Sequence, residues 1–286
     1  MRRTIACLSL VLLLSSCSWF HRVSPGAFEV HARELAARWQ GSADDRAWRE
    51  GFVPLEAMNP RGWARVGRVP HWVNISAHNG AWQLAAKLPA NSPTHADVRW
   101  PDGSASQVPL ITAASAYTEF SKPADFIEED CPTKGCRPLR VAGAELGEVP
   151  LKTSRGTIQV PAWLFTVEGV EQKYVHVAVA PSAVTARPER VPGGDEEVMA
   201  FDLIADKPNE LLLEYGYGAC DSIHGARAYE TDQLVVVDVD EEGSDELCLL
   251  MLKTATITVT LTRPLGDRLV LDYGTGLPVV RGVRRR

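Results

Sequence analysis

The chain has 286 residues, a formal net charge of −6 and a hydrophobic content of 45%. That content is ordinary for a folded protein with a real core, and the length suits one large domain or two small ones. The acidic balance argues against nucleic acid as a partner, because neutralising phosphates needs clustered lysine and arginine.

The first residues are organised like an export leader. Arg2 and Arg3 form a basic start, and residues 5–14 are an apolar run broken only by Cys7 and Ser9. A transmembrane helix needs about 20 apolar residues. The run is therefore too short to span a membrane, and its length fits the hydrophobic region of a signal peptide.

The apolar run ends in Leu14-Ser15-Ser16-Cys17 instead of a small-residue cleavage site that closes on alanine. This tetrad and the segment before it resemble a bacterial lipoprotein leader with its lipobox, a resemblance that covers residues 1–17. It implies cleavage after residue 16, diacylglycerol on Cys17 and an N-acyl chain such as palmitate, and two or more chains anchor a protein stably. The alternative is an ordinary secreted protein with an incidental cysteine.

The resemblance also implies a location. The body of the protein would lie outside the cytoplasm, facing away from the membrane that holds its lipid. In Gram-negative bacteria a small residue after the acceptor, here Ser18, resembles the sorting pattern for the outer membrane.

Four further cysteines remain, namely Cys131, Cys136, Cys220 and Cys248. An even count outside the reducing cytosol indicates two disulfides, and three connectivities are open. Sequence proximity favours Cys131–Cys136 and Cys220–Cys248. Zinc pairs sometimes use the spacing of the first two, but the other two are not a close pair and no paired histidines accompany them. We therefore expect no metal site and no cofactor.

The pattern along the chain predicts a mainly β protein, with a short N-terminal helical segment followed by two antiparallel β units, each sandwich- or barrel-like. Turn residues and composition divide the chain into a signal peptide (1–16), a tether (17–26), a helical segment (27–51), a first β unit (52–180), a linker rich in proline and glycine (181–197) and a second β unit (198–286).

The helical segment is predicted from Phe28, Ala32, Leu35 and Trp39, whose spacing places them on one helix face. A second short helix follows and ends before Gly51, and we expect Trp39 and Trp48 to anchor the core of this helical pair.

After Gly51, short apolar runs predict strands, including residues 72–77, 158–167 and 198–204. Pro101-Asp102-Gly103-Ser104 predicts a tight turn, because proline fixes one φ angle and glycine accepts a positive one.

The most unusual segment of the chain is the run Tyr215-Gly216-Tyr217-Gly218-Ala219-Cys220-Asp221. One interpretation is a strand end whose glycines permit a sharp bend beside a disulfide. The functional hypothesis is a binding rim in which Tyr215, Tyr217, Asp221 and His224 surround a small polar ligand.

Other motifs carry little chemistry. The segment Asp238-Val239-Asp240-Glu241-Glu242-Gly243 approaches a calcium loop, but position 12 of that pattern is Leu249, so we interpret it as an acidic hairpin turn. No nucleophile elbow, zinc-protease motif or phosphate loop occurs. Residues 281–286 hold four arginines; they indicate a solvated terminus or a contact with an anionic envelope polymer or lipid.

The sequence thus favours a membrane-anchored, extracytoplasmic binding or interaction module of the cell envelope over an enzyme. Its expected partners are the membrane, through the lipid, and an envelope protein or polymer. Two alternatives stay open: an envelope-acting hydrolase with an unrecognised site, and a structural or inhibitor-like lipoprotein. No catalytic residue is assigned.

Overall fold

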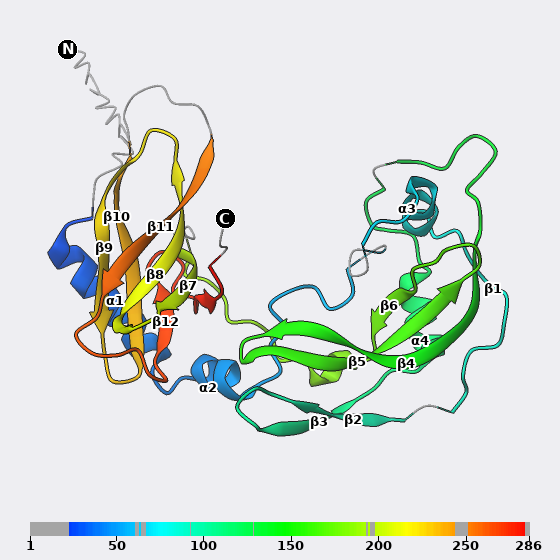
Figure 1. Cartoon of the computed structure of the whole chain (residues 1–286), viewed down its shortest axis with the longest axis horizontal. Helices are drawn as coiled ribbons and strands as arrows, with labels where there is room; N and C mark the ends of the chain where they lie inside the picture. The colour runs from blue at the N-terminus through cyan, green and yellow to red at the C-terminus, as the bar shows by residue number, and fades with distance from the viewer. Residues whose placement is uncertain are drawn as a thin grey trace, which may run out of the picture. The chain divides into compact units, whose positions relative to one another are not determined.

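The computed structural model describes residues 23–60, 63, 67–91, 93–127, 129–192, 194, 198–243 and 251–283. It is mainly β, with 41% strand and 17% helix, which confirms the predicted class. The strands within these ranges form four sheets. The chain divides into two compact units, one of residues 1–40 and 190–286 and one of residues 41–189 (Figure 1).

The unit that includes residues 190–286 is a sandwich of two sheets. One has the order β11-β8-β7-β13 and the other β12-β10-β9. Their bounds are β7 Val198–Ile204, β8 Lys207–Gly218, β9 Ser222–Glu230, β10 Leu234–Glu242, β11 Leu252–Thr260, β12 Leu269–Asp272 and β13 Val280–Arg281. Most pairings are antiparallel, as predicted, whereas β12 and β13 join the edges in parallel.

The core of this sandwich follows from the alternation of side chains along the strands. On β10, Val235, Val237 and Val239 face inward and pack against Leu211 and Leu213 of β8. Residues two apart in a strand share a face, so these valines form one continuous apolar surface.

Helix α1 (Pro25–Trp39) covers the other face of β9 and β10. Ser24 caps it by accepting a hydrogen bond from the main-chain N–H of Ala27 at 3.3 Å. The helix therefore starts within the predicted tether, two residues before the predicted helical segment. Its predicted apolar face is confirmed as buried, and the indole N–H of Trp39 donates to the carbonyl of Gly276 at 2.6 Å.

The unit of residues 41–189 is organised around the long β4–β5 hairpin (Figure 1). β1 joins β4 in parallel, β6 joins β5 antiparallel, and β2 and β3 form a separate hairpin. The bounds are α2 Ala43–Glu50, α3 His71–His78, β1 Trp82–Leu84, β2 His95–Arg99, β3 Ala105–Pro109, α4 Ala113–Phe120, β4 Leu139–Thr153, β5 Gly156–Val167, β6 Tyr174–Val177 and the 3₁₀ turn η1 Pro181–Ala183.

Two apolar clusters lie along this hairpin. One is aromatic, with Trp63, Trp82, Phe120, Phe165 and Tyr174 packed ring against ring. The other joins β2 and β3 to the hairpin, and includes Val98, Val108, Leu151, Ile158 and Val160. The hairpin is long enough to form one wall of both clusters.

The predicted pairing of the two N-terminal helices is wrong. Gly41 follows α1 with a φ of +70°, and the division between the two units falls directly before it. Helix α1 therefore belongs to one unit, where it packs on β9 and β10, and α2 belongs to the other. Trp39 and Trp48 are both buried, as predicted, but each lies in its own unit.

The predicted strand at residues 72–77 is also wrong, because the segment is helix α3. Pro70 stands at the N-cap position with an extended ψ of 141°, and the buried residues Val73, Ser76 and Ala77 have helical spacing. A short apolar run does not distinguish a strand from a helix turn.

The predicted linker at residues 181–197 is more ordered than expected over its described part. The main-chain N–H of Thr185 donates to Phe52 and the side chain of Arg187 to Pro54. The division between the units falls between residues 189 and 190, within the predicted linker.

Candidate functional site

The structure brings together three of the four residues of the predicted binding rim. The rings of Tyr215 and Tyr217, on β8, have centroids 5.6 Å apart. Asp221, in the turn before β9, accepts a hydrogen bond from the main-chain N–H of Gly218. The carboxyl of Glu241, near the end of β10, is hydrogen-bonded to Asp221. The described cluster is therefore two tyrosines and two carboxyl groups.

His224 is not part of that cluster. Its Nε2 lies 3.0 Å from Oε2 of Glu242. Glu242 follows Glu241 directly, so the two side chains point to opposite faces of β10. The structure therefore does not bring His224 together with the other three residues, and β9 contains a register shift opposite residues 240 and 241.

The carboxyl cluster has perturbed acidity. Burial, the hydrogen bond to Asp221 and the charges of Asp221 and Asp238 raise the pKa of Glu241 to about 7. Burial of the ring raises the pKa of the Tyr215 phenol, and the charges of Tyr217 and Glu241 raise it further. Two carboxyl groups in hydrogen-bond contact hold a proton between them, since two adjacent negative charges repel.

This acidity predicts a pH dependence of stability. The folded state keeps a proton on Glu241 up to about pH 7, whereas the unfolded group loses it near its ordinary pKa of 4.5. The stabilisation is therefore complete below about pH 4.5 and is lost as the pH rises to about 7. In urea titrations across this range, we expect Glu241→Gln to flatten the slope of unfolding free energy against pH. The Glu242→Gln variant should keep the slope, and an unchanged slope in Glu241→Gln would contradict the assignment.

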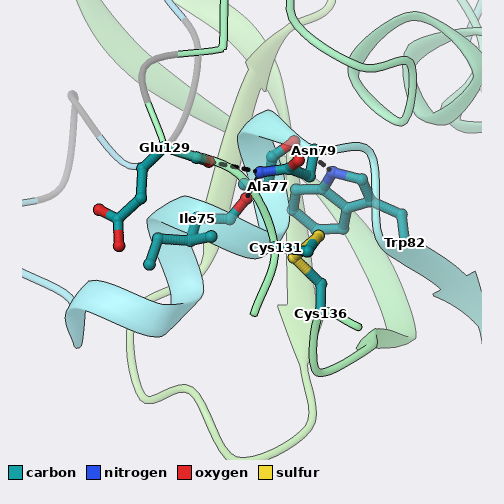
Figure 2. Close-up of a disulfide and its surroundings, with 7 residues drawn as sticks. All are labelled: Ile75, Ala77, Asn79, Trp82, Glu129, Cys131 and Cys136. Carbon is teal, nitrogen blue, oxygen red and sulfur yellow. Dashed lines mark hydrogen bonds between the residues drawn. A yellow bond between two sulfur atoms is a disulfide. The ribbon is translucent and has the colours of Figure 1, made fainter. Parts of the chain in front are cut away.

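The predicted disulfide between Cys131 and Cys136 is confirmed, with Cα atoms 4.9 Å apart. Figure 2 shows it beside α3, where the side-chain amide of Asn79 donates to the carbonyls of Ile75 and Glu129, both at 2.9 Å. The loop that contains the disulfide is thus joined to the helix end.

The second predicted disulfide stays a prediction. Cys220 is disulfide-bonded, but Cys248 lies outside the described residues. Cys17, the predicted lipid acceptor, also lies outside them.

Removing the first disulfide should have a moderate effect. A crosslink that closes so short a loop contributes about 2 kcal/mol in the chain-entropy model. We expect the double variant Cys131→Ser/Cys136→Ser to lower the free energy of unfolding by that amount. Hydrogen exchange in α3 and in the loop that contains the disulfide, followed by mass spectrometry, measures this loss of stability. Protection equal to that of the oxidised parent would show that the crosslink does not stabilise this region.

The predicted acidic hairpin turn at residues 238–243 is corrected by the structure. Residues 238–242 belong to β10, and the carboxyl of Asp238 is buried against the guanidinium of Arg227. Among the described residues, no group of three or more metal-ligating side chains occurs.

His176, on β6, is buried, and one of its two ring nitrogens, Nε2, has two polar neighbours. Its Nε2 lies 3.1 Å from Oε2 of Glu119 and 3.2 Å from Nδ2 of Asn59, and its ring packs near Phe120. Burial lowers the pKa of His176, while Glu119 opposes that shift. These contacts hold the imidazole in one orientation on β6.

A cleft opens in the unit of residues 41–189, between β2 and the β4–β5 hairpin. Its volume of about 420 Å³ lies within the range typical of ligand pockets. The lining residues come from β2 and the turn after it, from β4 and from the start of β5: Asp97, Arg99, Trp100, Pro101, Glu148, Thr157, Ile158 and Gln159.

One border of the cleft is the start of β5, residues 157–159, whose second edge is free because β6 pairs with β5 only from Ala162 onward. The main-chain N–H and C=O of Lys152, on β4, point away from β5, because they bond to Glu56 at 3.5 Å and to Leu55 at 2.9 Å. Lys152 is in register with Thr157, so this is a non-hydrogen-bonded pair. By alternation, Thr157 and Gln159 also turn their main-chain groups away from β4.

The other border is the free edge of β2. The main-chain N–H of Trp100 donates to the carbonyl of Ser104 at 2.9 Å. This bond fixes which residues of β2 direct their main-chain groups toward β3 and which direct them away. Asp97 and Arg99 therefore direct their main-chain groups away from β3. Between them, the two edges carry main-chain donors and acceptors that the described ladders leave unused.

The charges of the cleft have no ion-pair partner among the residues that the structure describes. Asp97, Arg99 and Glu148 are exposed, and none forms an ion pair with another residue in the described ranges. The cleft thus offers two carboxylates, one guanidinium and the polar side chains of Thr157 and Gln159 to a ligand.

One end of the cleft is held by Arg155. Its guanidinium lies 4.2 Å from the ring centroid of Trp100, donates to Asp102 at 2.7 Å and to the carbonyl of Glu50 at 3.3 Å, and contacts Ser104. Hydrogen bonds from Ser104 and Arg155 lower the pKa of Asp102 to about 2. The predicted turn at Pro101-Asp102-Gly103-Ser104 is confirmed, and it is fixed to the β4–β5 turn.

Sequence reasoning missed the cleft. Asp97, Arg99, Glu148 and Gln159 stand at outward positions of strands, where polar residues are usual. Only the turn after β2 is predicted from the sequence, and a turn does not by itself indicate a ligand.

No protein-family model matches the chain, and comparisons with curated proteins and with solved structures find no match. No helix among the described residues combines the length and the apolar character needed to cross a bilayer.

Proposed function

We propose that this chain is an exported lipoprotein, anchored through a lipid on Cys17, that acts as a binding module in the cell envelope. The observation that carries the proposal is Leu14-Ser15-Ser16-Cys17 at the end of a short apolar run behind Arg2 and Arg3. Each part has a chemical role in export: the basic start, the apolar run, the small residues before the cut and the thiol that is alkylated.

The disulfides support an extracytoplasmic location. Cys131–Cys136 is a stabilising crosslink in a folded unit, and Cys220 is also disulfide-bonded. Such bonds persist in oxidising compartments and are rare in the cytosol.

The start of the fold supports a close attachment to the membrane. The carbonyl of Val23 accepts a hydrogen bond from Arg227 at 2.9 Å, directly before the cap of α1. Six residue steps separate Cys17 from Val23, and at most about 3.6 Å per step gives a reach of about 20 Å. The sandwich unit would then lie next to the lipid headgroups.

The cleft supports a binding role. It is open and polar, and it is bordered by main-chain groups that the described ladders leave unused. Such groups can hold a ligand by hydrogen bonds and by charge.

Palmitate labelling in a bacterial host tests the proposal. We expect radiolabelled palmitate to enter the parent chain and the protein to sediment with membranes. The Cys17→Ala variant should lose both properties almost completely, whereas Cys7→Ala, with a cysteine removed from the apolar run, should keep them. Membrane association without label, or label that survives Cys17→Ala, would overturn the proposal.

A further inference from the structure

We propose that the cleft between β2 and β5 binds a short, extended peptide that carries two positive charges and one negative charge. This inference rests on the proposed binding role and names its ligand class, but it does not depend on the lipid anchor. The cleft walls are Asp97 and Arg99 on one side, and Glu148, Thr157 and Gln159 on the other.

The free strand edges indicate a peptide. Thr157 and Gln159 on β5, and Asp97 and Arg99 on β2, direct main-chain N–H and C=O groups away from their own partner strands. An extended peptide satisfies such groups with its own main chain, which is the basis of recognition by strand edges. A sugar or an aliphatic molecule lacks this regular alternation of donors and acceptors.

The charges indicate which peptide. Within the described part of the chain, Asp97 and Glu148 form no ion pair, and neither does Arg99, whose guanidinium can bind a carboxylate through two parallel hydrogen bonds. A ligand with two ammonium groups and one carboxylate complements this set. The cleft volume of about 420 Å³ limits the bound part to a few residues.

The cleft is built to hold its shape. Arg155 ties the turn after β2 to the hairpin turn before β5, through Asp102, Ser104 and the ring of Trp100. Beneath the cleft, Val98 and Ile158 belong to one buried cluster. A preformed site loses less free energy to ordering when a peptide binds.

The probe is the tripeptide alanyl-lysyl-alanine with free ends, which carries two ammonium groups and one carboxylate. Calorimetric titration into the full, disulfide-intact chain should show saturable binding. Two analogues separate the charges: one has norleucine in place of lysine, and the other has an amidated C-terminus. Each should bind about tenfold more weakly.

Variants assign each charge to its partner. Arg99→Gln should weaken the free acid about tenfold and leave the amidated analogue unchanged. Asp97→Asn and Glu148→Gln should together weaken the lysine peptide about tenfold or more, and change the norleucine analogue less. Glu145→Gln, on the same strand β4 but outside the cleft lining, is the matched control and should bind as the parent does.

Three outcomes would overturn the inference. They are an absence of binding at millimolar peptide, binding that the cleft variants do not change, and tighter binding of an uncharged oligosaccharide at the same residues. All substituted side chains are exposed, so each variant should have the same melting temperature as the parent. Palmitate labelling of Cys17 is independent of this titration, so a failed peptide experiment leaves the lipid anchor standing.

Discussion

Replacing Arg227 with alanine is expected to lower the free energy of unfolding of the sandwich unit by about 3–5 kcal/mol. The guanidinium pairs with Asp238, whose side chain is 3% exposed, and lies 3.9 Å from Asp240. It also lies 4.7 Å from the ring centroid of Phe28 and donates to the carbonyl of Val23. Without it a buried carboxylate loses its countercharge.

A matched exposed pair provides the control for Arg227. Arg263 pairs with Asp232 at 2.7 Å, but the side chains are 49% and 90% exposed. Surface pairs of this kind contribute about 0–1 kcal/mol, so Arg263→Ala should have little effect on stability. Hydrogen exchange of β9 and β10 in urea reports on this unit alone. Equal losses in the two variants would contradict the importance of the buried pair.

Replacing Asp272 with alanine is expected to have a similar cost, about 3–5 kcal/mol, because several donors lose a charged acceptor at once. The carboxyl is 2% exposed. It accepts hydrogen bonds from the main-chain N–H of Val198 at 3.0 Å, and from the N–H and hydroxyl of Thr275 at 2.8 and 2.7 Å. It therefore ties the start of β7 to the turn after β12.

Asparagine at position 272 separates charge from geometry. Asp272→Asn keeps an oxygen acceptor of the same size and should lose less stability than Asp272→Ala. The exposed Asp232→Ala should stay within about 1 kcal/mol of the parent. Hydrogen exchange of β7 and β12 measures these differences, and a parent-like Asp272→Ala would show that the buried carboxyl is dispensable.

The features that sequence predicted correctly depend on local patterns. The apolar face of α1 follows from the spacing of Phe28, Ala32, Leu35 and Trp39, and the structure buries all four. The strand at residues 198–204 was predicted with its observed bounds, and the Cys131–Cys136 disulfide follows from proximity along the chain.

The features that sequence missed depend on contacts between distant segments. Trp39 donates to Gly276, 237 residues away, and this contact places α1 with the C-terminal strands instead of with α2. No local pattern encodes that choice. His224 is close to Tyr217 along the chain, but in the structure it contacts Glu242, whose side chain lies on the other face of β10 from Glu241.

The cleft, too, depends on contacts between segments that are distant in sequence. Its walls, β2 and β5, are separated by more than fifty residues of sequence, and its charged residues look like ordinary outward positions of strands. Only the register of the β4–β5 hairpin shows that Thr157 and Gln159 direct their main-chain groups into the cleft. A ligand site of this kind needs the tertiary structure to become visible.

Intact-mass spectrometry of the protein purified from bacterial membranes tests whether Cys17 carries the lipid anchor. We expect a mature chain that begins at Cys17 and carries the added mass of a diacylglycerol and an acyl chain on that residue. A chain that begins at Met1, or one that is cut elsewhere with Cys17 unmodified, would contradict it.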